Sequence, residues 1–257
     1  MHESSFLKMQ LFMEMYGSKA FAASERPTVL EVGSKRYHDQ PSYRDFIVDE
    51  RFNYTGLDLE AGENVDVVPQ NAYLWQELSD EAFDICISGQ TFEHNPYFWI
   101  TMCEISRILK PGGYCCIIVP GAGPVHRYPL DCWRFYPDSW AALCHIAGLD
   151  IIETFFETDR TSQMVLGGYF RDSCVIATRP RRDAVEAENL KRRLSDMTRH
   201  FTAANTAFDP QPFIKGPCFE RYERELANRP TRGRAHALFR KVVKKRGSAV
   251  FDPEKNL

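Results

Sequence analysis

Residues 83–119 read FDICISGQTFEHNPYFWITMCEISRILKPGGYCCIIV, and this stretch decides the fold. Phe83–Ser88 is a continuous apolar run, which is typical of a strand buried on both faces of a sheet. Tyr97–Leu109 has helical spacing and stops at Lys110-Pro111-Gly112-Gly113, a strong turn signal. Tyr114–Val119, rich in Ile, Val and Cys, predicts the next strand. The stretch therefore predicts a strand, a helix and a second strand parallel to the first.

The same alternation of strands and helices extends to both sides of this unit. A helix is predicted at Pro137–Ala147, with proline in its first turn and Gly148 as its stop. Alternating strands and helices predict an α/β fold with a mostly parallel sheet and helices on both faces. Further strands are predicted at Thr28–Val32, Tyr54–Leu57, Val65–Val68, Leu149–Phe156 and Ser173–Thr178.

Composition excludes several classes of protein. Of the 257 residues, 44% are hydrophobic and 26% charged, which is ordinary for a globular chain and argues against a wholly disordered one. The net charge of −3 is not that of a polyanion-binding protein, so we expect no nucleic-acid partner. No apolar run approaches the roughly 20 residues of a membrane-spanning helix. Eight cysteines without a CxxC pair predict buried, reduced thiols and a cytoplasmic protein.

Three regions are expected along the chain. Residues 1–24 hold an amphipathic helix rather than a signal peptide, because Glu3 and Lys8 interrupt the pattern of a signal sequence. Residues 25–180 form the main domain, and residues 181–257 form a helical, basic extension. From Arg229 to Arg246 there are eight Lys or Arg residues and no acid. This tail is either a solvated surface or a surface for an anionic partner.

Polar residues follow the predicted strands, where ligands of open α/β sheets bind. A dinucleotide site would need the pattern G-x-G-x-x-G, but only Gly33 follows the first strand, which argues against NAD. An adenosyl ligand without phosphates needs one glycine and an acid beyond the second strand for the ribose hydroxyls, and Asp58 fits that role. The alternative is that Asp58 only caps the following turn.

The ordered set of motifs resembles class I S-adenosylmethionine-dependent methyltransferases of the type 11 group, over about residues 28–178. The motifs that carry the resemblance are Val29-Leu30-Glu31-Val32-Gly33, Gly56-Leu57-Asp58, Asn71-Ala72, Phe83–Ser88, Phe92-Glu93-His94 and Glu104–Gly113. The resemblance implies a Rossmann-like sheet of seven strands, the last one antiparallel, and S-adenosylmethionine as cofactor.

The resemblance also implies where the cofactor lies. Glu31 and Gly33 would contact the methionine portion, Asp58 the ribose and Asn71-Ala72 the adenine. Asn71 stands where an acid is common, so its amide oxygen would accept the adenine amino hydrogen. Ser88 and Gln90 would line the floor of the methyl-transfer site. The predicted cofactor residues are Glu31, Gly33, Ser34, Asp58, Leu59, Asn71, Ala72, Ser88 and Gln90.

A second constellation, residues 126–138, follows the strand Tyr114–Val119 and reads HRYPLDCWRFYPD. It resembles a segment of bacterial methyltransferases of surface glycans and related small molecules, which implies carbohydrate biosynthesis. Aromatic faces suit a sugar ring, and an arginine can bind a carboxylate or phosphate with two hydrogen bonds. The alternative is that Trp133 and Phe135 lie in the core and that Arg134 pairs with Asp131. The predicted substrate residues are Tyr97, Tyr128, Trp133 and Arg134.

The predicted catalytic residues are His126, Asp131 and His94, in that order. Imidazole titrates near neutrality and suits removal of a hydroxyl proton. His94 has three readings: it packs at a helix start, contacts the adenosyl group or joins a metal site with Glu93. Since two adjacent residues cannot make a metal site alone, we predict none.

The sequence therefore predicts methyl transfer from S-adenosylmethionine to a hydroxyl or amine of a sugar-like or other small metabolite. The alternative is a non-catalytic protein that keeps the fold for binding or assembly. A nucleic-acid methyltransferase ranks third, because Ser88-Gly89-Gln90-Thr91 stands where an Asn/Asp-Pro-Pro-Tyr motif would be expected. The sequence leaves open a homodimer and an anionic partner for the basic tail.

Overall fold

The computed structural model describes residues 3–22, 24–37, 40–47, 51–158, 168–201, 206 and 216–228. The chain divides into two units, Met1–Phe208 and Asp209–Leu257. In the second unit, the structure describes the helix α9 (Pro217–Ala227). The basic tail from Arg229 to Arg246 lies outside the described residues.

One sheet of six strands forms the centre of the first unit, in the order β2-β1-β3-β4-β6-β5. Neighbouring strands from β2 to β4 are parallel, and β6 is antiparallel to both of its neighbours. The α/β architecture with helices on both faces is confirmed. The strands are β1 (Thr28–Val32), β2 (Asn53–Leu57), β3 (Phe83–Gly89), β4 (Leu109–Pro120), β5 (Asp150–Phe156) and β6 (Asp172–Thr178).

The expected count of seven strands was wrong by one. Val65–Val68 forms only an isolated bridge, between Val67 and Leu57. The backbone N–H groups of Asp66 and Val67 both donate to the carbonyl of Gly56, so this segment turns back at once instead of running along the sheet. A strand of β-branched residues needs a ladder of partners, and one bridge does not provide it.

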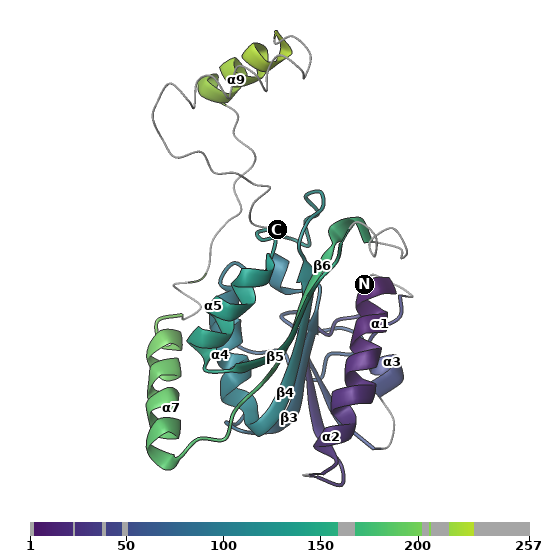
Figure 1. The fold of residues 1–257 in the computed structure, drawn as a ribbon, viewed down its shortest axis with the longest axis vertical. Helices are drawn as coiled ribbons and strands as arrows, with labels where there is room; N and C mark the ends of the chain where they lie inside the picture. The colour runs from purple at the N-terminus through teal and green to yellow at the C-terminus, as the bar shows by residue number, and fades with distance from the viewer. Residues whose placement is uncertain are drawn as a thin grey trace. The chain divides into compact units, whose positions relative to one another are not determined.

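One face of the sheet is covered by N-terminal helices (Figure 1). These are α1 (Glu3–Phe12), which continues through a π-helical turn (Met13–Gly17) into α2 (Ser18–Ala20), and α3 (Arg44–Ile47). Met9 and Phe12 pack there against the strand residues Ile85, Ile87 and Ile118.

Polar side chains fix α1 as well. Ser4 and Ser5 are both buried: Ser4 donates to Asp172, and Ser5 shares a hydrogen bond with Tyr43. Lys8 binds Asp172 on β6 with 2.9 Å between Nζ and Oδ2. The helix that opens the chain is thereby bound to the last strand of the sheet.

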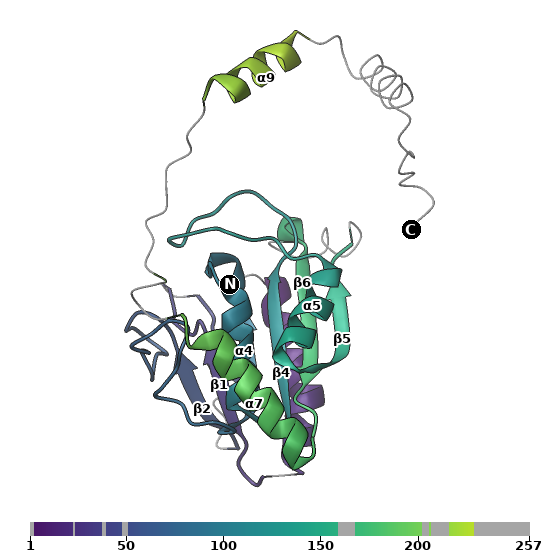
Figure 2. The same ribbon diagram turned by 90° about the vertical axis from the view of Figure 1, so that its left-hand side faces the viewer.

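The opposite face carries α4 (Phe98–Ile108), α5 (Pro137–Ala147) and α7 (Ala184–Thr198), as Figures 1 and 2 show. Because α7 packs on α4 through Leu190, Leu194 and Cys103, the main unit continues beyond the boundary expected at residue 180. No helix in the described part of the chain is long and apolar enough to cross a membrane.

Candidate functional site

The parallel strands β1, β3 and β4 end at the same edge of the sheet, which we call the carboxyl edge. Val32 pairs with Ser88, and Gly89 pairs with Ile118. A cavity of about 120 Å³ opens there beside the ends of β1 and β3. Its lining includes four of the predicted cofactor residues, Glu31, Gly33, Ser34 and Gln90, whereas Asp58, Leu59, Asn71, Ala72 and Ser88 do not line it.

Gly33 is required by the conformation of the chain itself. Its φ of 80° lies in the left-handed region, which favours glycine. A Cβ atom at this position would also lie 2.1 Å from Oγ1 of Thr91. The sequence analysis attributed this glycine to an adenosyl ligand, and the structure shows a second reason within the chain, the side chain of Thr91.

Glu31 is buried at the end of β1, and its carboxyl group accepts a hydrogen bond from the Tyr54 hydroxyl. Burial outweighs this hydrogen bond and raises the pKa of Glu31 to about 8. The carboxyl is therefore mostly protonated at neutral pH and would ionise when a cation comes next to it.

Asp58 holds the turn between the ends of β1 and β2. Its Oδ2 accepts from the backbone N–H of Lys35 at 3.0 Å, and its Oδ1 accepts from that of Glu60 at 3.3 Å. This is the capping contact that was the alternative to ribose binding. A carboxylate oxygen accepts more than one hydrogen bond, so both roles are compatible.

Asn71 is tied to two parts of the chain. Its amide oxygen accepts from the backbone of Tyr73 at 2.8 Å, and its amide nitrogen donates to the carbonyl of Phe201 at 2.9 Å. The Phe201 ring packs on Tyr73 and Tyr97. Sequence reasoning missed Phe201, because it lies 130 residues from Asn71 along the chain and only the folding of α7 brings it back.

Ser88 and Gln90 end β3 differently. The buried Ser88 hydroxyl donates to the carbonyl of Val32 at 2.9 Å, so it joins two strands. The Gln90 amide donates to Asp172 at 3.1 Å, while its buried oxygen has no hydrogen-bond partner. Of the two residues predicted for the floor of the methyl-transfer site, Gln90 is the one with an unpartnered hydrogen-bond acceptor.

The long loop between β4 and α5 brings together His126, Asp131 and Arg134, and Figure 2 shows this loop extending beyond the sheet. Arg134 binds both oxygens of Asp131, at 2.6 and 2.8 Å, and the backbone of His126 donates to the same carboxylate at 2.7 Å. Burial opposes ionisation of Asp131, but Arg134 outweighs it and holds the pKa of that carboxyl below its usual value.

These contacts correspond to the internal pairing that was the alternative for Asp131 and Arg134. The Asp131 side chain is 2% exposed and fully engaged, which suits positioning of His126 better than proton transfer. Both terminal nitrogens of Arg134 are likewise committed to Asp131, which leaves them poorly placed to bind a substrate carboxylate.

Glu93 is the residue of this region that sequence reasoning undervalued. It is completely buried, and neither carboxylate oxygen has a hydrogen-bond partner. Burial raises its pKa to about 8. The Nε2 atom of His94 lies 3.5 Å from Glu93 Oε1, and the ring of His126 lies 5.0 Å from that of His94. Burial also lowers the pKa of His94, which favours its neutral form.

The predicted substrate aromatics fall into two groups. The exposed Tyr128 ring contacts His94 and Tyr37, with centroid distances of 6.4 and 5.8 Å. Trp133 donates to the carbonyl of Asn95 at 3.1 Å and packs on Phe98, but it is 40% exposed and therefore does not lie in the core. Tyr97 packs with Phe201. Of these aromatic residues, Tyr128 lies against the imidazole pair.

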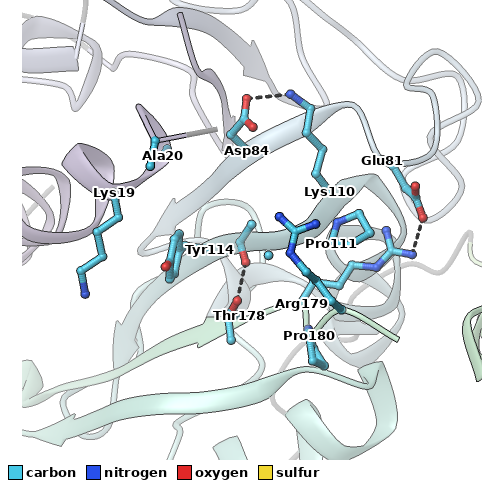
Figure 3. A pocket seen from close by; sticks show the side chains of 14 residues that line it. Lys19, Ala20, Glu81, Asp84, Lys110, Pro111, Tyr114, Thr178, Arg179 and Pro180 are labelled. Atoms are coloured by element: carbon cyan, nitrogen blue, oxygen red, sulfur yellow. Dashed lines mark hydrogen bonds and ion pairs between the residues drawn. The ribbon is translucent and has the colours of Figure 1, made fainter. Parts of the chain in front are cut away.

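A larger cavity, of about 730 Å³, lies at the opposite, amino edge of the parallel strands (Figure 3). Four of its charged residues form two pairs, Lys110 with Asp84 at 2.7 Å and Arg179 with Glu81 at 2.8 Å, whereas Lys19 and Arg181 in its lining are exposed. None of the predicted site residues lines it.

Buried polar atoms without a partner mark the carboxyl edge. In the described part of the chain, such side-chain atoms belong to six residues, and only Ser106 lies elsewhere, on α4. Since an unpartnered buried polar group costs about 1–3 kcal/mol, their concentration at one edge indicates a ligand that would satisfy them. The other five residues are Ser34, Arg36, Gln90, Glu93 and Arg134.

Comparison with known proteins finds a methyltransferase domain over part of the chain. Residues 47–117 match the family model of a methyltransferase domain. This match confirms the resemblance drawn from the sequence motifs. The search of curated proteins gave no match.

Solved structures share the fold at low identity. The cyclase SpnF is 16% identical, with a TM-score of 0.50, covering 68% of this chain and 81% of that one. A methyltransferase from Aquifex aeolicus is 18% identical (TM-score 0.45; 68% and 96% covered). The 1,6-didemethyltoxoflavin-N1-methyltransferase of Burkholderia thailandensis is 14% identical (TM-score 0.45; 69% and 89% covered).

Proposed function

We propose that this chain, which carries a class I S-adenosylmethionine-dependent methyltransferase domain, methylates a hydroxyl or amine of a sugar-like or other small metabolite. The observation that carries the proposal is the set of buried, unpartnered polar atoms at the carboxyl edge, beside a cavity lined by Glu31 and Gly33. Because the fold alone hosts different reactions, and one structural neighbour is named a cyclase, the argument rests on these residues.

The residues fit the cofactor at several points. S-adenosylmethionine supplies an activated methyl group when bound. The buried acid Glu31 would ionise beside the ammonium of its methionine portion, and the unpartnered hydroxyl of Ser34 would find a partner there. Asp58 would accept the ribose hydroxyls with lone pairs that its two backbone donors leave free.

The acceptor would lie under the loop between β4 and α5. Tyr128 offers an exposed aromatic face for a sugar ring, next to the imidazoles of His94 and His126. The acceptor's proton would leave to this imidazole pair, with Asp131 positioning His126. The rest of the catalysis would come from alignment of the acceptor with the methyl group.

Calorimetry with S-adenosylhomocysteine tests the cofactor site. Asp58→Ala removes a charged acceptor and should weaken binding by about 1.5–3 kcal/mol, one to two decades in affinity. Asp196→Ala, on the exposed face of α7, is the matched control and should bind normally. An unchanged affinity in Asp58→Ala would remove Asp58 from the site.

Methyl transfer to a panel of nucleotide sugars, oligosaccharides and small amines, read by mass, tests the reaction. Product formation would identify the acceptor class and the atom methylated. Tight binding of S-adenosylhomocysteine without turnover on any acceptor would instead favour the non-catalytic alternative.

A second copy of the chain is the partner that we propose for the free edge of the sheet. β5 is an edge strand, and Ile151, Ile152 and Phe155 on it are exposed. Exposed apolar edge strands pair with other chains unless they are covered. Light scattering should find a dimer that Ile152→Lys dissociates, whereas a monomeric parent protein would exclude this partner.

Two further proposals concern the tail and the compartment. The eight basic residues between Arg229 and Arg246 would bind an anionic surface or partner, and removal of residues 229–257 should leave turnover of small acceptors intact.

All eight cysteines are free thiols, which supports a reducing compartment such as the cytoplasm. Fractionation of cells that produce the protein would test this location.

A further inference from the structure

We infer that Glu93, His94 and His126 form a binding site for one divalent transition-metal ion. Each of these residues offers one ligand atom, and the three atoms lie within 4.8 Å of one another. No other group of three His, Cys, Asp or Glu residues in the described part of the chain meets this criterion. The inference rests on the proposed function in one respect, that the acceptor lies beside these imidazoles.

The spacing needs only a small contraction around an ion. His94 Nε2 and Glu93 Oε1 are 3.5 Å apart, and two ligands bound at about 2.1 Å to one ion lie roughly 3–4 Å apart. The loop between β4 and α5 holds the third ligand, and its backbone is anchored beside Glu93, where the N–H of Cys132 donates to the Glu93 carbonyl at 2.7 Å.

The Glu93 carboxylate is the second, independent observation. It is 0% exposed, and both of its oxygens have no hydrogen-bond partner. The nearest cation of the loop is Arg134. Its two terminal nitrogens donate to Asp131, so the positive charge of Arg134 is balanced by the negative charge of Asp131. The Glu93 carboxyl is therefore left without a partner, and a metal ion bound there would supply one and favour its ionised form.

The imidazoles are oriented as metal ligands are. His94 Nδ1 lies 2.5 Å from the carbonyl of Leu130. A carbonyl only accepts, so Nδ1 carries the proton and Nε2, the atom near Glu93, keeps its lone pair. The Nδ1 atom of His126 lies 3.4 Å from Asp131 Oδ2 and 3.4 Å from Arg134 Nη2, so these two side chains hold the ring in place. Such outer hydrogen bonds orient the histidine ligands of metal sites.

Two imidazoles and one carboxylate select the class of ion. Imidazole suits zinc, cobalt, nickel and iron, whereas magnesium and calcium require a shell of oxygen ligands. Three protein ligands leave positions for water or for the acceptor hydroxyl. An ion there would lower the pKa of a bound hydroxyl and assist its deprotonation in place of a free imidazole.

Cobalt(II) is the probe for a direct test on the full chain. Reduced, chelator-treated protein should bind one Co²⁺ per chain in equilibrium dialysis, with a visible absorption band that reports histidine coordination. Loss of outer partners alone weakens metal sites roughly 10–100-fold, so Glu93→Gln should weaken binding by about 100-fold or more. His126→Asn should weaken Co²⁺ binding by a similar factor. Because His126 lies on the loop, this variant keeps the test valid if Glu93→Gln fails to fold.

Two matched controls separate this site from incidental ligands. His145→Asn, exposed on α5, and Cys132→Ser, exposed beside the site, should both retain one Co²⁺ with unchanged affinity. Absence of saturable binding, or binding that Glu93→Gln and His126→Asn leave unchanged, would overturn the inference. Calorimetry with S-adenosylhomocysteine on the same samples shows separately whether the proposed function fails.

Discussion

The two edges of the same sheet carry opposite kinds of cavity. At the amino edge, a cavity of about 730 Å³ is lined by two ion pairs, Lys110 with Asp84 and Arg179 with Glu81, and by the exposed Lys19 and Arg181. At the carboxyl edge, the cavity beside β1 and β3 is only about 120 Å³, yet three of its lining residues, Ser34, Arg36 and Gln90, carry a buried polar atom without a partner. The smaller cavity is thus the one with binding capacity left.

This difference is why we propose the ligand site from unmet hydrogen-bonding and charge requirements and not from cavity volume. A paired charge inside the fold has already exchanged its water for a protein partner and gains little from a ligand. An unpaired buried group has lost its hydrogen bonds to water and gained none in the protein. A ligand that forms those hydrogen bonds regains this free energy on binding. The amino edge stabilises the fold, and the carboxyl edge is left for a ligand.

The largest expected effect is at the carboxyl edge, on catalysis. On a hydroxyl acceptor, His126→Ala should lower kcat by about 10²–10⁴ while the affinity for S-adenosylhomocysteine stays nearly unchanged. Steady-state kinetics with and without added Co²⁺ measure it. Near-normal turnover of a hydroxyl acceptor would remove His126 from the chemistry and leave His94 as the next residue to substitute.

At the amino edge the expected effect is on stability alone. Arg179 is buried and donates to the carbonyls of Arg107 and Leu109. Arg179→Met should lower the free energy of unfolding by roughly 2–4 kcal/mol, because those carbonyls lose their donor. Arg181→Met, exposed on the same cavity, should cost less than about 0.5 kcal/mol. If the Arg179→Met protein folded normally but bound the cofactor more weakly, the conclusion that the amino edge affects stability alone would be wrong.

The smallest effect is a change of stability with pH. The pKa of Glu93 is about 8, above its ordinary value of 4.5, so the folded chain holds this proton more tightly than the unfolded chain does. Its contribution to the free energy of unfolding is present below pH 4.5 and falls as the pH rises through 8. Glu93→Gln cannot ionise, so between pH 5 and 8 it should gain roughly 1–3 kcal/mol relative to the parent.

Urea unfolding in the presence of a chelator measures this difference at each pH. Glu31, whose pKa is raised in the same way, is common to both proteins and cancels. A difference that stays constant from pH 5 to 8 would mean that Glu93 is not the uncompensated acid that distinguishes the carboxyl edge.

The fold followed from local pattern wherever the signals were local. The helix predicted at Pro137–Ala147 has those bounds as α5, since proline starts it and Gly148, with a φ of 67°, ends it. Lys110–Gly113 end the preceding helix, as the sequence predicted. They do not form a separate loop, however, but lie within the start of β4, where the pairing with β3 shifts register.

The site was predictable only in part, because its decisive features are long-range. The position of Glu31, Gly33 and Ser34 at the end of a predicted strand was enough to predict them as site residues. All three line the cavity. The isolation of the Glu93 carboxylate depends on a loop about 35 residues further on, which covers it without offering it a partner. No local pattern in the sequence reports that a buried acid remains unpaired.

The attachment of α1 has a consequence for biosynthesis. Ser4 and Lys8 find their acid, Asp172, 168 and 164 residues later, and the same carboxylate holds the amide of Gln90 in the cavity. A nascent chain therefore carries its first helix, made at the outset, without its buried polar partners until β6 has been synthesised. The hydrogen bonds that hold α1 and Gln90 at the carboxyl edge are therefore completed only after β6 has been synthesised.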